Sequence, residues 1–260
     1  RPGPVLIDIP DNLQRELIDP NKLEGFNSKK YISKSSNFLS TTQIEKDFFE
    51  LINNAKRPVI IGGWGIHISK MEKEFLSFAE TLGIPVALTW GGSDLINHTH
   101  DLYIGTFGTH GMRHANMAVQ NSDLIISLGS RLDTKSTGSP ITTFAREAKK
   151  IMVDIDPHEL SKFSYFGLEM DLLIHDDLKK FFKVINSYNY NTNNNKFDKW
   201  ISRIKRWRDD LTIINYNNIS SKNLEPYSTF NLLSKYLPSN CHIYIDTGCS
   251  IAWAMQSLRL

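Results

Sequence analysis

The fold class of this chain follows from one short segment, Ser122-Asp123-Leu124-Ile125-Ile126-Ser127-Leu128-Gly129-Ser130-Arg131. Its middle is a nearly continuous apolar run of strand length, which is typical of a strand that is buried on both faces of a parallel sheet. A glycine follows at once and an arginine comes two residues later. In open parallel sheets this is the position where strands end and ligands bind. We therefore expect a central parallel strand that ends at a functional edge.

Similar segments lie on both sides of this strand. We expect strands at residues 58–63, 85–89, 150–156 and 172–174, because each is a short apolar run beside a glycine, proline or aspartate. Helical spacing of apolar residues predicts helices at 71–82, 115–121 and 178–186, and an earlier one that Thr41 or Thr42 can cap. The alternation predicts a doubly wound α/β domain over residues 38–188, with helices on both faces of a parallel sheet.

The two ends of the chain have a different pattern. Residues 5–10 are an apolar run of strand length, and residues 11–37 are polar and weakly periodic, like a linker. Residues 243–248 resemble a strand that continues into a helical pattern at 251–256. We interpret 1–37 as the tail of one domain with a linker and 226–260 as the start of another, so we expect the chain to be part of a longer protein.

Residues 189–225 join the main domain to the last segment. They begin in the asparagine-rich tract 188–195, which is typical of a surface linker. A helix is expected at 197–211, with Trp200, Ile204 and Trp207 on one face. The favoured interpretation is an amphipathic helix that packs on the domain. The alternative is that these tryptophans, with Trp253, form a dimer surface.

Composition excludes several classes of protein. The chain is 40% hydrophobic, and its 30 Lys and Arg against 28 Asp and Glu give a net charge of +2, far below that of a typical nucleic-acid-binding protein. It has no apolar run long enough for a membrane helix. The two cysteines, Cys241 and Cys249, cannot form a disulfide framework or a zinc site of the usual spacing, which favours a reducing, cytoplasmic setting. We expect Cys249 to be a small buried residue rather than a reactive thiol.

Glycine-rich loops are the first candidate ligand sites. In Gly105-Thr106-Phe107-Gly108-Thr109-His110-Gly111, the glycines permit close approach of the backbone to a ligand, and His110 can stack on it or form a hydrogen bond. We select Gly108, Thr109, His110 and Gly111. A second loop, Gly62-Gly63-Trp64-Gly65, lacks the full dinucleotide spacing, so a nucleotide loop and a plain tight turn are equally open for it.

Charged residues after two strands are the second group of candidates. Gly129, Ser130, Arg131 and Asp133 follow the strand at 124–129, and Arg131 is suited to phosphate, although a structural ion pair is the alternative. Asp154 and Asp156 end the strand at 150–156. There a carboxylate can accept hydrogen bonds from ribose, or Asp156 can instead cap the helix that Pro157 begins.

Taken in order along the chain, these motifs resemble those of thiamine-diphosphate enzymes of the acetolactate synthase family. The matching segments are residues 1–10, the loop with His110-Gly111 and Ala115-Asn116, Ser122-Asp123-Leu124-Ile125, Gly129-Ser130-Arg131-Leu132-Asp133 and Asp154-Ile155-Asp156-Pro157. The resemblance covers nearly the whole chain. It implies a tail of the pyrimidine-binding domain at 1–37, the central domain at 38–188 and the start of the diphosphate-binding domain at 226–260.

The resemblance also implies an activity and cofactors. The expected enzyme decarboxylates a 2-oxo acid and joins the product to a carbonyl acceptor, using thiamine diphosphate and Mg²⁺ in a homodimer or homotetramer. Gly248, Cys249 and Ser250 match the turn that approaches the diphosphate, with Cys249 and Ser250 standing where the family has Gln and His. The catalytic glutamate and the metal ligands fall outside this chain. In this family the central domain binds FAD through the loops that match Gly108–Gly111, Gly129–Asp133 and Asp154–Asp156.

Several alternatives remain open from the sequence. One is a thiamine-diphosphate decarboxylase, or a related enzyme of surface-sugar synthesis, that does not make acetolactate. A stand-alone nucleotide-binding module of the deoxyhypusine synthase or sirtuin type shares the central fold and would bind NAD. A third is a non-catalytic assembly domain whose ligand site has decayed.

Overall fold

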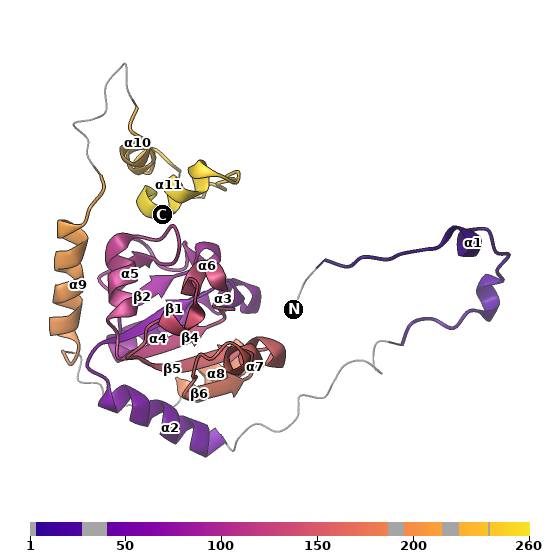
Figure 1. Ribbon diagram of the computed structural model, residues 1–260, viewed down its shortest axis with the longest axis horizontal. Coiled ribbons are helices and arrows are strands. Elements are labelled where there is room, and N and C mark those ends of the chain that lie inside the picture. Colours follow the sequence, from indigo (N-terminus) through magenta and orange to yellow (C-terminus); the bar gives the residue numbers. More distant parts are fainter. Residues whose placement is uncertain (1–3, 28–40, 187–194, 215–223, 239) are drawn as a thin grey trace. The chain divides into compact units, whose positions relative to one another are not determined.

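A computed structural model describes residues 4–27, 41–186, 195–214, 224–238 and 240–260. The chain forms two compact units, Arg1–Phe38 and Leu39–Leu260. Figure 1 shows the larger unit as a sheet flanked by helices. Within the described residues, no helix is long and apolar enough to cross a membrane.

The smaller unit has little regular structure. It contains the short helix α1 (Asp11–Gln14) and the 3₁₀ turn η1 (Pro20–Lys22), which the side chain of Asp19 caps. The strand predicted at residues 5–10 is wrong. These residues form no strand, and Leu6 is 94% exposed. A strand is stabilised by hydrogen bonds to a neighbouring strand, and the described part of the chain offers this segment none.

The larger unit is built on a six-stranded sheet in which all strands are parallel. The spatial order is β3-β2-β1-β4-β5-β6. The strands are β1 (Pro58–Gly62), β2 (Val86–Leu88), β3 (Tyr103–Thr106), β4 (Leu124–Leu128), β5 (Lys149–Asp154) and β6 (Leu172–His175). This is the order of a doubly wound α/β fold, in which the chain reverses direction across the sheet between β1 and β4. The predicted fold class is confirmed.

Five of the six strands lie where the sequence predicts them, but β3 was not expected. Its four residues include Gly105, which has φ +108°, and the pairing of β3 with β2 shifts register between Val86 and Ala87. A glycine and an irregular register interrupt the apolar run from which a strand is usually recognised. The segment therefore reads as a loop in the sequence.

Helices connect the strands, and the predicted ones are present with small shifts at their ends. They are α2 (Thr41–Asn54), α3 (Gly65–Ser69), α4 (Glu72–Leu82), α5 (Arg113–Gln120), α6 (Thr134–Thr137), α7 (Pro157–Tyr165), α8 (Leu178–Ile185) and α9 (Asp198–Asp210), with the 3₁₀ turns η3 (Trp90–Gly92) and η4 (Ile141–Thr143). Helix α2 begins at Thr41, but the side chains that were expected to cap it lie outside the described residues, as does most of the asparagine-rich tract.

Two hydrophobic cores lie on opposite faces of the sheet. Ile60 of β1 points into one core with phenylalanines from α2, α4 and α8, where the rings of Phe48 and Phe181 meet edge to face at 5.7 Å. Val59 and Ile61 point into the other core, with residues of α5, α7 and α9. Side chains alternate across a strand, so both faces of the sheet must be covered.

Helix α9 packs on the second core through its tryptophans. Trp200 is 4% exposed, and its indole N–H donates a hydrogen bond of 3.1 Å to the carbonyl oxygen of Pro58 in β1. The ring of Trp207 meets that of Trp200 edge to face at 5.6 Å. The packing interpretation of this helix is confirmed, so Trp200 is not available for a dimer surface.

The last segment contains α10 (Pro226–Leu233) and α11 (Cys249–Ser257) and contacts the β3 edge of the sheet. The hydroxyl of Thr106 donates to the carbonyl oxygen of Met255 at 2.6 Å. The backbones of His98 and Leu260 also meet, with a hydrogen bond of 3.0 Å from the His98 N–H. The helix expected at 251–256 is confirmed. The strand expected at 243–248 is wrong, because these residues pair with no strand.

Candidate functional site

The loops that follow β3, β4 and β5 meet at the carboxyl edge of the sheet, which collects most of the predicted site residues. Parallel strands end at the same edge, and in doubly wound folds ligands bind there, in the crevice between the two strands where the order reverses. In this sheet those strands are β1 and β4. The predicted residues at 248–250 lie at the start of α11.

The backbones of the two loops at this crevice touch each other. The N–H of Gly63 donates to the carbonyl oxygen of Leu128 at 3.1 Å, and the N–H of Gly65 donates to that of Gly129 at 2.9 Å. A Cβ atom added to Gly63 would lie 2.5 Å from the carbonyl oxygen of Gly129. These glycines therefore serve contact between the loops, which is the tight-turn interpretation of the Gly62–Gly65 motif.

The Gly108–Gly111 loop is also held by hydrogen bonds within the protein. The N–H of Gly108 donates to the side-chain oxygen of Asn116 at 2.8 Å, and the Asn116 amide donates back to the Gly108 carbonyl at 2.9 Å. The N–H of Thr109 donates to the carbonyl of Lys135 at 2.8 Å. A Cβ added to Gly111 would lie 2.4 Å from the carbonyl carbon of Phe107. The close approach that these glycines permit is to the protein's own backbone.

Arg131 forms an ion pair, but with a partner that sequence spacing does not indicate. Its Nε lies 2.7 Å from Oε1 of Glu159 on α7, while the second carboxylate oxygen of Glu159 pairs with Lys162 at 2.7 Å. Lys162 also donates to the backbone carbonyl of Arg131. Glu159 is buried, whereas the side chain of Arg131 is 61% exposed. The three charges tie the loop after β4 to α7.

The predicted aspartates accept hydrogen bonds from the starts of the following helices. Asp133 accepts from the backbone N–H groups of Lys135 and Ser136 at 3.0 and 3.1 Å, and so caps α6. Asp156 accepts from the N–H of His158 and caps α7, as the helix-cap interpretation proposes. Asp154 in turn accepts from the N–H of Asp156 at 2.9 Å. A carboxylate at a helix N-terminus satisfies the free N–H groups there and places negative charge beside the positive end of the helix dipole.

Aromatic and histidine side chains over β1–β3 complete this edge, and sequence reasoning did not select most of them. His110 stacks on Trp90, with ring centroids 5.5 Å apart. His67 contacts Glu72 through Nδ1 and Asp94 through Nε2, both at 2.9 Å. Burial by itself would lower the pKa of His67, but the hydrogen bonds and charges of these two carboxylates raise it. No regular spacing links Trp90 or Glu159 to the motifs, so only the fold brings them to this edge. Asn116, by contrast, already stands beside Ala115 in one of the motifs.

These observations test whether the edge fits FAD, the group that the resemblance implies here. A dinucleotide needs an open crevice, free N–H groups for its pyrophosphate and an unpaired cation. In the described residues the crevice is filled by backbone, the N–H groups of Gly108, Thr109, Gly111 and Gly129 are bonded within the protein, and Arg131 is paired. The residues at this edge do not fit FAD.

The start of α11 is exposed. Gly248 precedes the helix with φ +90°, no side chain caps it, and a Cβ built on Gly248 would meet nothing within 4 Å. Cys249 is exposed, so the expectation that it is a buried small residue is wrong. Ser250 donates a hydrogen bond of 3.1 Å to the carbonyl of Asp246. An uncapped helix start in open space keeps its N–H groups available for an anion such as a diphosphate.

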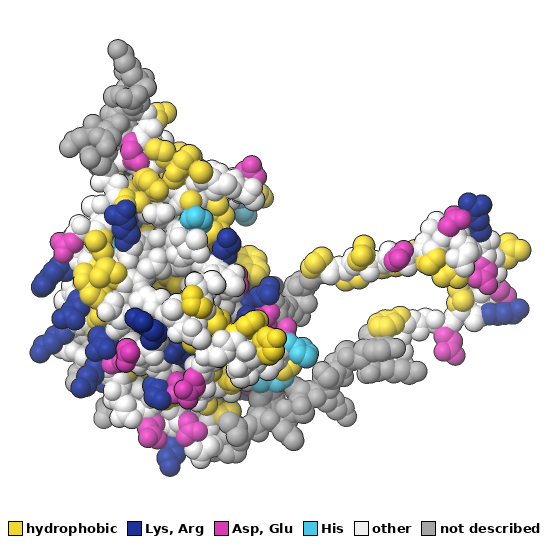
Figure 2. Space-filling view, viewed as in Figure 1, with side chains coloured by type: hydrophobic (Ala, Val, Ile, Leu, Met, Phe, Trp, Pro, Cys, Tyr) yellow, Lys and Arg dark blue, Asp and Glu magenta, His cyan; other side chains and the backbone are white. Residues whose placement is uncertain are grey.

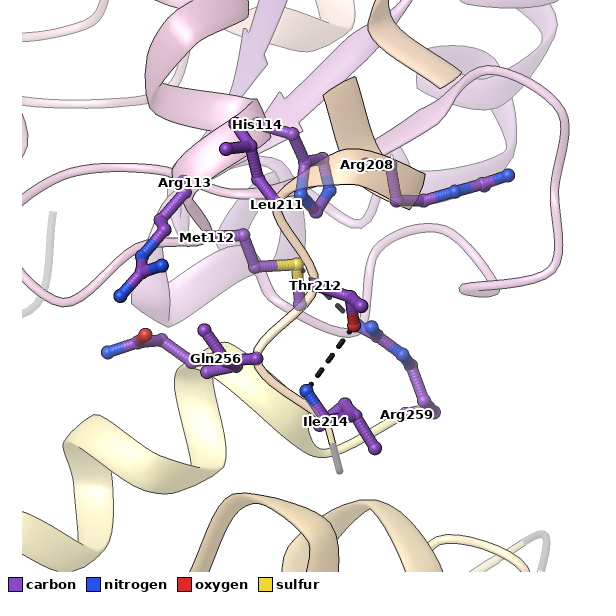
Figure 3. Close-up of a pocket in the computed structure, with 10 residues that line it drawn as sticks. Met112, Arg113, His114, Arg208, Leu211, Thr212, Ile214, Gln256 and Arg259 are labelled. Atoms are coloured by element: carbon purple, nitrogen blue, oxygen red, sulfur yellow. Dashed lines mark hydrogen bonds between the residues drawn. The ribbon is translucent and has the colours of Figure 1, made fainter. Parts of the chain in front are cut away.

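A small cavity of about 30 Å³ lies between the start of α5, the end of α9 and the end of α11 (Figure 3). The guanidinium of Arg259 points toward the sulfur of Met112, 3.5 Å away, whereas Arg113 and Arg208 extend to opposite sides. Because the three cations do not converge, the cavity does not form a phosphate pocket. The described residues also contain no group of three or more histidine, cysteine or acidic side chains placed to hold a metal.

The histidines near this cavity predict a pH dependence of stability. Burial and the charge of Arg259 lower the pKa of both His98 and His114 to about 4. The unfolded chain takes up a proton on each as the pH falls below its ordinary value near 6.5, and the folded chain does not. The free energy of unfolding should therefore be highest above pH 6.5 and should fall as the pH drops toward 4, by on the order of 2 kcal/mol for each histidine.

Urea unfolding followed by circular dichroism between pH 4 and 8 measures this dependence. His98→Gln removes the ring whose Nδ1 accepts from the Leu260 N–H at 2.9 Å, so it should reduce the slope of stability against pH in this window. The exposed His242 provides the matched control, and His242→Gln should keep the full slope. An unchanged slope in His98→Gln would contradict the assignment.

Comparisons with known proteins agree with the fold. Residues 46–185 match the family model described as "Thiamine pyrophosphate enzyme, central domain". An acetolactate synthase large subunit of Cyanidium caldarium is 33% identical over 100% of this chain and 44% of its own length. A probable acetolactate synthase large subunit of Methanococcus aeolicus is 33% identical over 85% of this chain and 38% of its own length. Acetolactate synthase 2, chloroplastic, of Nicotiana tabacum is 30% identical over 98% of this chain and 38% of its own length.

The chain thus spans less than half the length of each of these relatives. The family model covers the segment from α2 to α8, which includes all six strands of the sheet. Sequence, sheet order and family match therefore agree. The chain belongs to the thiamine pyrophosphate enzyme family, and its residues 46–185 match the central domain of that family.

Proposed function

We propose that this chain is part of a thiamine-diphosphate-dependent enzyme that decarboxylates a 2-oxo acid and joins the product to a carbonyl acceptor, as an acetolactate synthase does. Three similar relatives carry the name acetolactate synthase, and the alignment with one of them covers all of this chain. When bound, the cofactor supplies a carbanion that adds to the 2-oxo acid and accepts the electrons released on decarboxylation.

Within that enzyme we assign the parts of this chain to three domains. Residues 1–37 are the tail of the pyrimidine-binding domain with a linker, 38–188 the central domain, 189–225 a linker with α9, and 226–260 the start of the diphosphate-binding domain. The boundary between the two compact units, after Phe38, supports the first division.

Exposed apolar side chains support the assignment of the last segment. Tyr244 is 92% exposed, Tyr236 76% and Leu233 47%. Figure 2 shows apolar side chains gathered over the region of α10 and α11. A contiguous exposed apolar surface is typical of a surface that another part of a protein covers. We assign this role to the remainder of the diphosphate-binding domain.

The observation that carries the proposal is the open start of α11. Its free N–H groups and positive dipole end suit the diphosphate of the cofactor, with Gly248, Cys249 and Ser250 nearest to it. The Mg²⁺ that accompanies the diphosphate takes its protein ligands from parts of the enzyme that this chain does not span. The role of this chain is therefore to bind and orient the cofactor beside the central domain.

Placing a carboxylate at the start of α11 tests this assignment. Cys249→Asp should weaken thiamine diphosphate binding by about 10- to 100-fold in the full-length protein, because the new charge caps the helix and repels the diphosphate. Cys249→Ser, which adds no charge, is the matched control and should change binding by less than about threefold. Both affinities come from isothermal titration with Mg²⁺ present. Equal affinities in the two variants would remove α11 from the cofactor site.

The activity itself is tested with the full-length protein, thiamine diphosphate, Mg²⁺ and pyruvate. We expect release of carbon dioxide together with acetolactate, identified by proton NMR. Carbon dioxide with only an aldehyde product would favour a decarboxylase instead. Thiamine diphosphate binding without turnover of any 2-oxo acid would favour a related enzyme of another pathway.

We further propose that the enzyme is cytoplasmic, is a homodimer or homotetramer and acts on small molecules, with no nucleic-acid or membrane partner. Both cysteines are free and exposed, which suits a reducing compartment. The near-neutral net charge of +2 offers no strong attraction for nucleic acid. Light scattering of the full-length protein measures the number of subunits.

A further inference from the structure

We infer that the carboxyl edge of the central sheet is closed by the protein's own loops and takes no FAD or other dinucleotide. In place of a bound cofactor, a network of Arg131, Glu159 and Lys162 stabilises this edge. The inference concerns only the central domain. It holds whether or not the full-length enzyme uses thiamine diphosphate.

The described backbone fills the space between the ends of β1 and β4. Gly65 and Gly129 lie so close that a Cβ added to Gly65 would be 2.7 Å from the Cα of Gly129. A Cβ added to Gly129 would in turn lie 2.9 Å from the Cα of Gly65. Contact of backbone with backbone at both positions leaves no room for a pyrophosphate, which in this fold class lies in that crevice.

The groups at this edge that would bind phosphate already have partners within the protein. Hydrogen bonds of 2.8 Å connect the N–H of Gly108 to Asn116 and the N–H of Thr109 to the Lys135 carbonyl. The starts of α6, α7 and α8 are capped by Asp133, Asp156 and Asp177, respectively. A dinucleotide would have to break these bonds and bring its phosphates close to three carboxylates, and both steps cost free energy.

The cations Arg131 and Lys162 at this edge are paired with a carboxylate. Glu159 is 9% exposed and has one oxygen on Arg131 and the other on Lys162, each at 2.7 Å. Lys162 also donates to the Arg131 carbonyl, and the buried Leu132 is held next to it with φ +46°. If either cation turned to a phosphate, the buried carboxylate of Glu159 would keep only one of its two partners. The network therefore holds the loop after β4 in place without a ligand.

The direct experiment measures flavin in the full-length protein. Cells expressing it are supplied with riboflavin, and the purified protein is denatured to release flavin for fluorescence measurement. The native protein, with thiamine diphosphate and Mg²⁺ present, is then titrated calorimetrically with FAD, NAD and ADP in turn. We expect no released flavin and no saturable heat. Near-stoichiometric flavin, or saturable binding of any of the three, would overturn the inference.

Substitutions test the structural role of the network separately. Arg131→Ala in the nucleotide-free protein should lower the melting temperature by about 2–4 °C, because it leaves Glu159 with only one cation. Arg146→Ala, at an exposed arginine, is the matched control and should leave the melting temperature unchanged. If Arg131 instead served a nucleotide, Arg131→Ala would behave like the control, and that result would contradict the proposal.

Catalytic turnover in the same preparation separates this inference from the proposed function. An active, flavin-free enzyme supports both. An inactive protein that lacks flavin supports the closed edge and counts against the proposed function alone. An active enzyme that holds flavin supports the proposed function and overturns the closed edge.

Discussion

Trp200→Ala is expected to lower the free energy of unfolding by about 3–5 kcal/mol, the largest effect that we expect from a single substitution in this chain. Trp200 is 4% exposed and packs α9 onto the second core. Its removal leaves a cavity between helix and sheet and deprives the Pro58 carbonyl of its indole donor. Both losses act on β1, the strand at the centre of the fold.

Urea unfolding of the 260-residue chain, followed by circular dichroism, gives the free energy for comparison with a matched control. Trp64→Ala removes the same type of side chain at a position that is 56% exposed, so it should lower the free energy of unfolding by about 1 kcal/mol or less. If the two variants lose equal stability, α9 does not pack on the sheet as described. A change in subunit number without loss of stability would instead favour a dimer surface at Trp200.

Gly129→Ala is expected to have the second largest effect and to lower the free energy of unfolding by about 2–4 kcal/mol. Gly129 has φ +60°, where an L-residue is strained, and the added Cβ would meet the backbone of Gly65 at 2.9 Å. Backbone atoms at the start of α3 cannot move aside without a large cost in free energy, so strain and overpacking both contribute. The same urea experiment measures the loss.

Gly167→Ala is the matched control for this substitution. Gly167 also has positive φ, +73°, but its nearest neighbour would be the methyl group of Thr142 at an ordinary 3.5 Å. Only backbone strain of about 1 kcal/mol is expected there. The difference between the two variants therefore measures how tightly the β1 and β4 loops touch. Equal losses would mean that the crevice between these strands can open.

Much of this fold can be predicted from the sequence because its strands are buried on both faces. Segments such as Leu124–Leu128 carry apolar side chains on both sides, so they stand out from the amphipathic helices around them. Strand β3 could not be predicted in this way, since Gly105 interrupts it. The reverse happens at residues 5–10 and 243–248, where a strand is predicted and none forms. These residues have side chains that are typical of strands, but a strand also needs a hydrogen-bonded neighbour.

The candidate site was predicted less well, for a physical reason. A glycine or arginine at the end of a strand suits a ligand, but it equally suits contact with a neighbouring loop. Which of the two applies depends on residues far away in sequence, such as Glu159 for Arg131 and Gly65 for Gly129. Asp156 is an exception, because the proline that follows it already indicates a helix cap.

The most direct test of this account is to quantify the cofactors that the full-length protein retains. The protein is isolated from cells supplied with thiamine and riboflavin, dialysed to equilibrium against a known concentration of thiamine diphosphate with Mg²⁺, and denatured. The released compounds are then measured by liquid chromatography. The account predicts saturable thiamine diphosphate, approaching one molecule per chain, and no FAD. A protein that retains FAD but does not bind thiamine diphosphate would contradict both the diphosphate site at α11 and the closed edge of the central sheet.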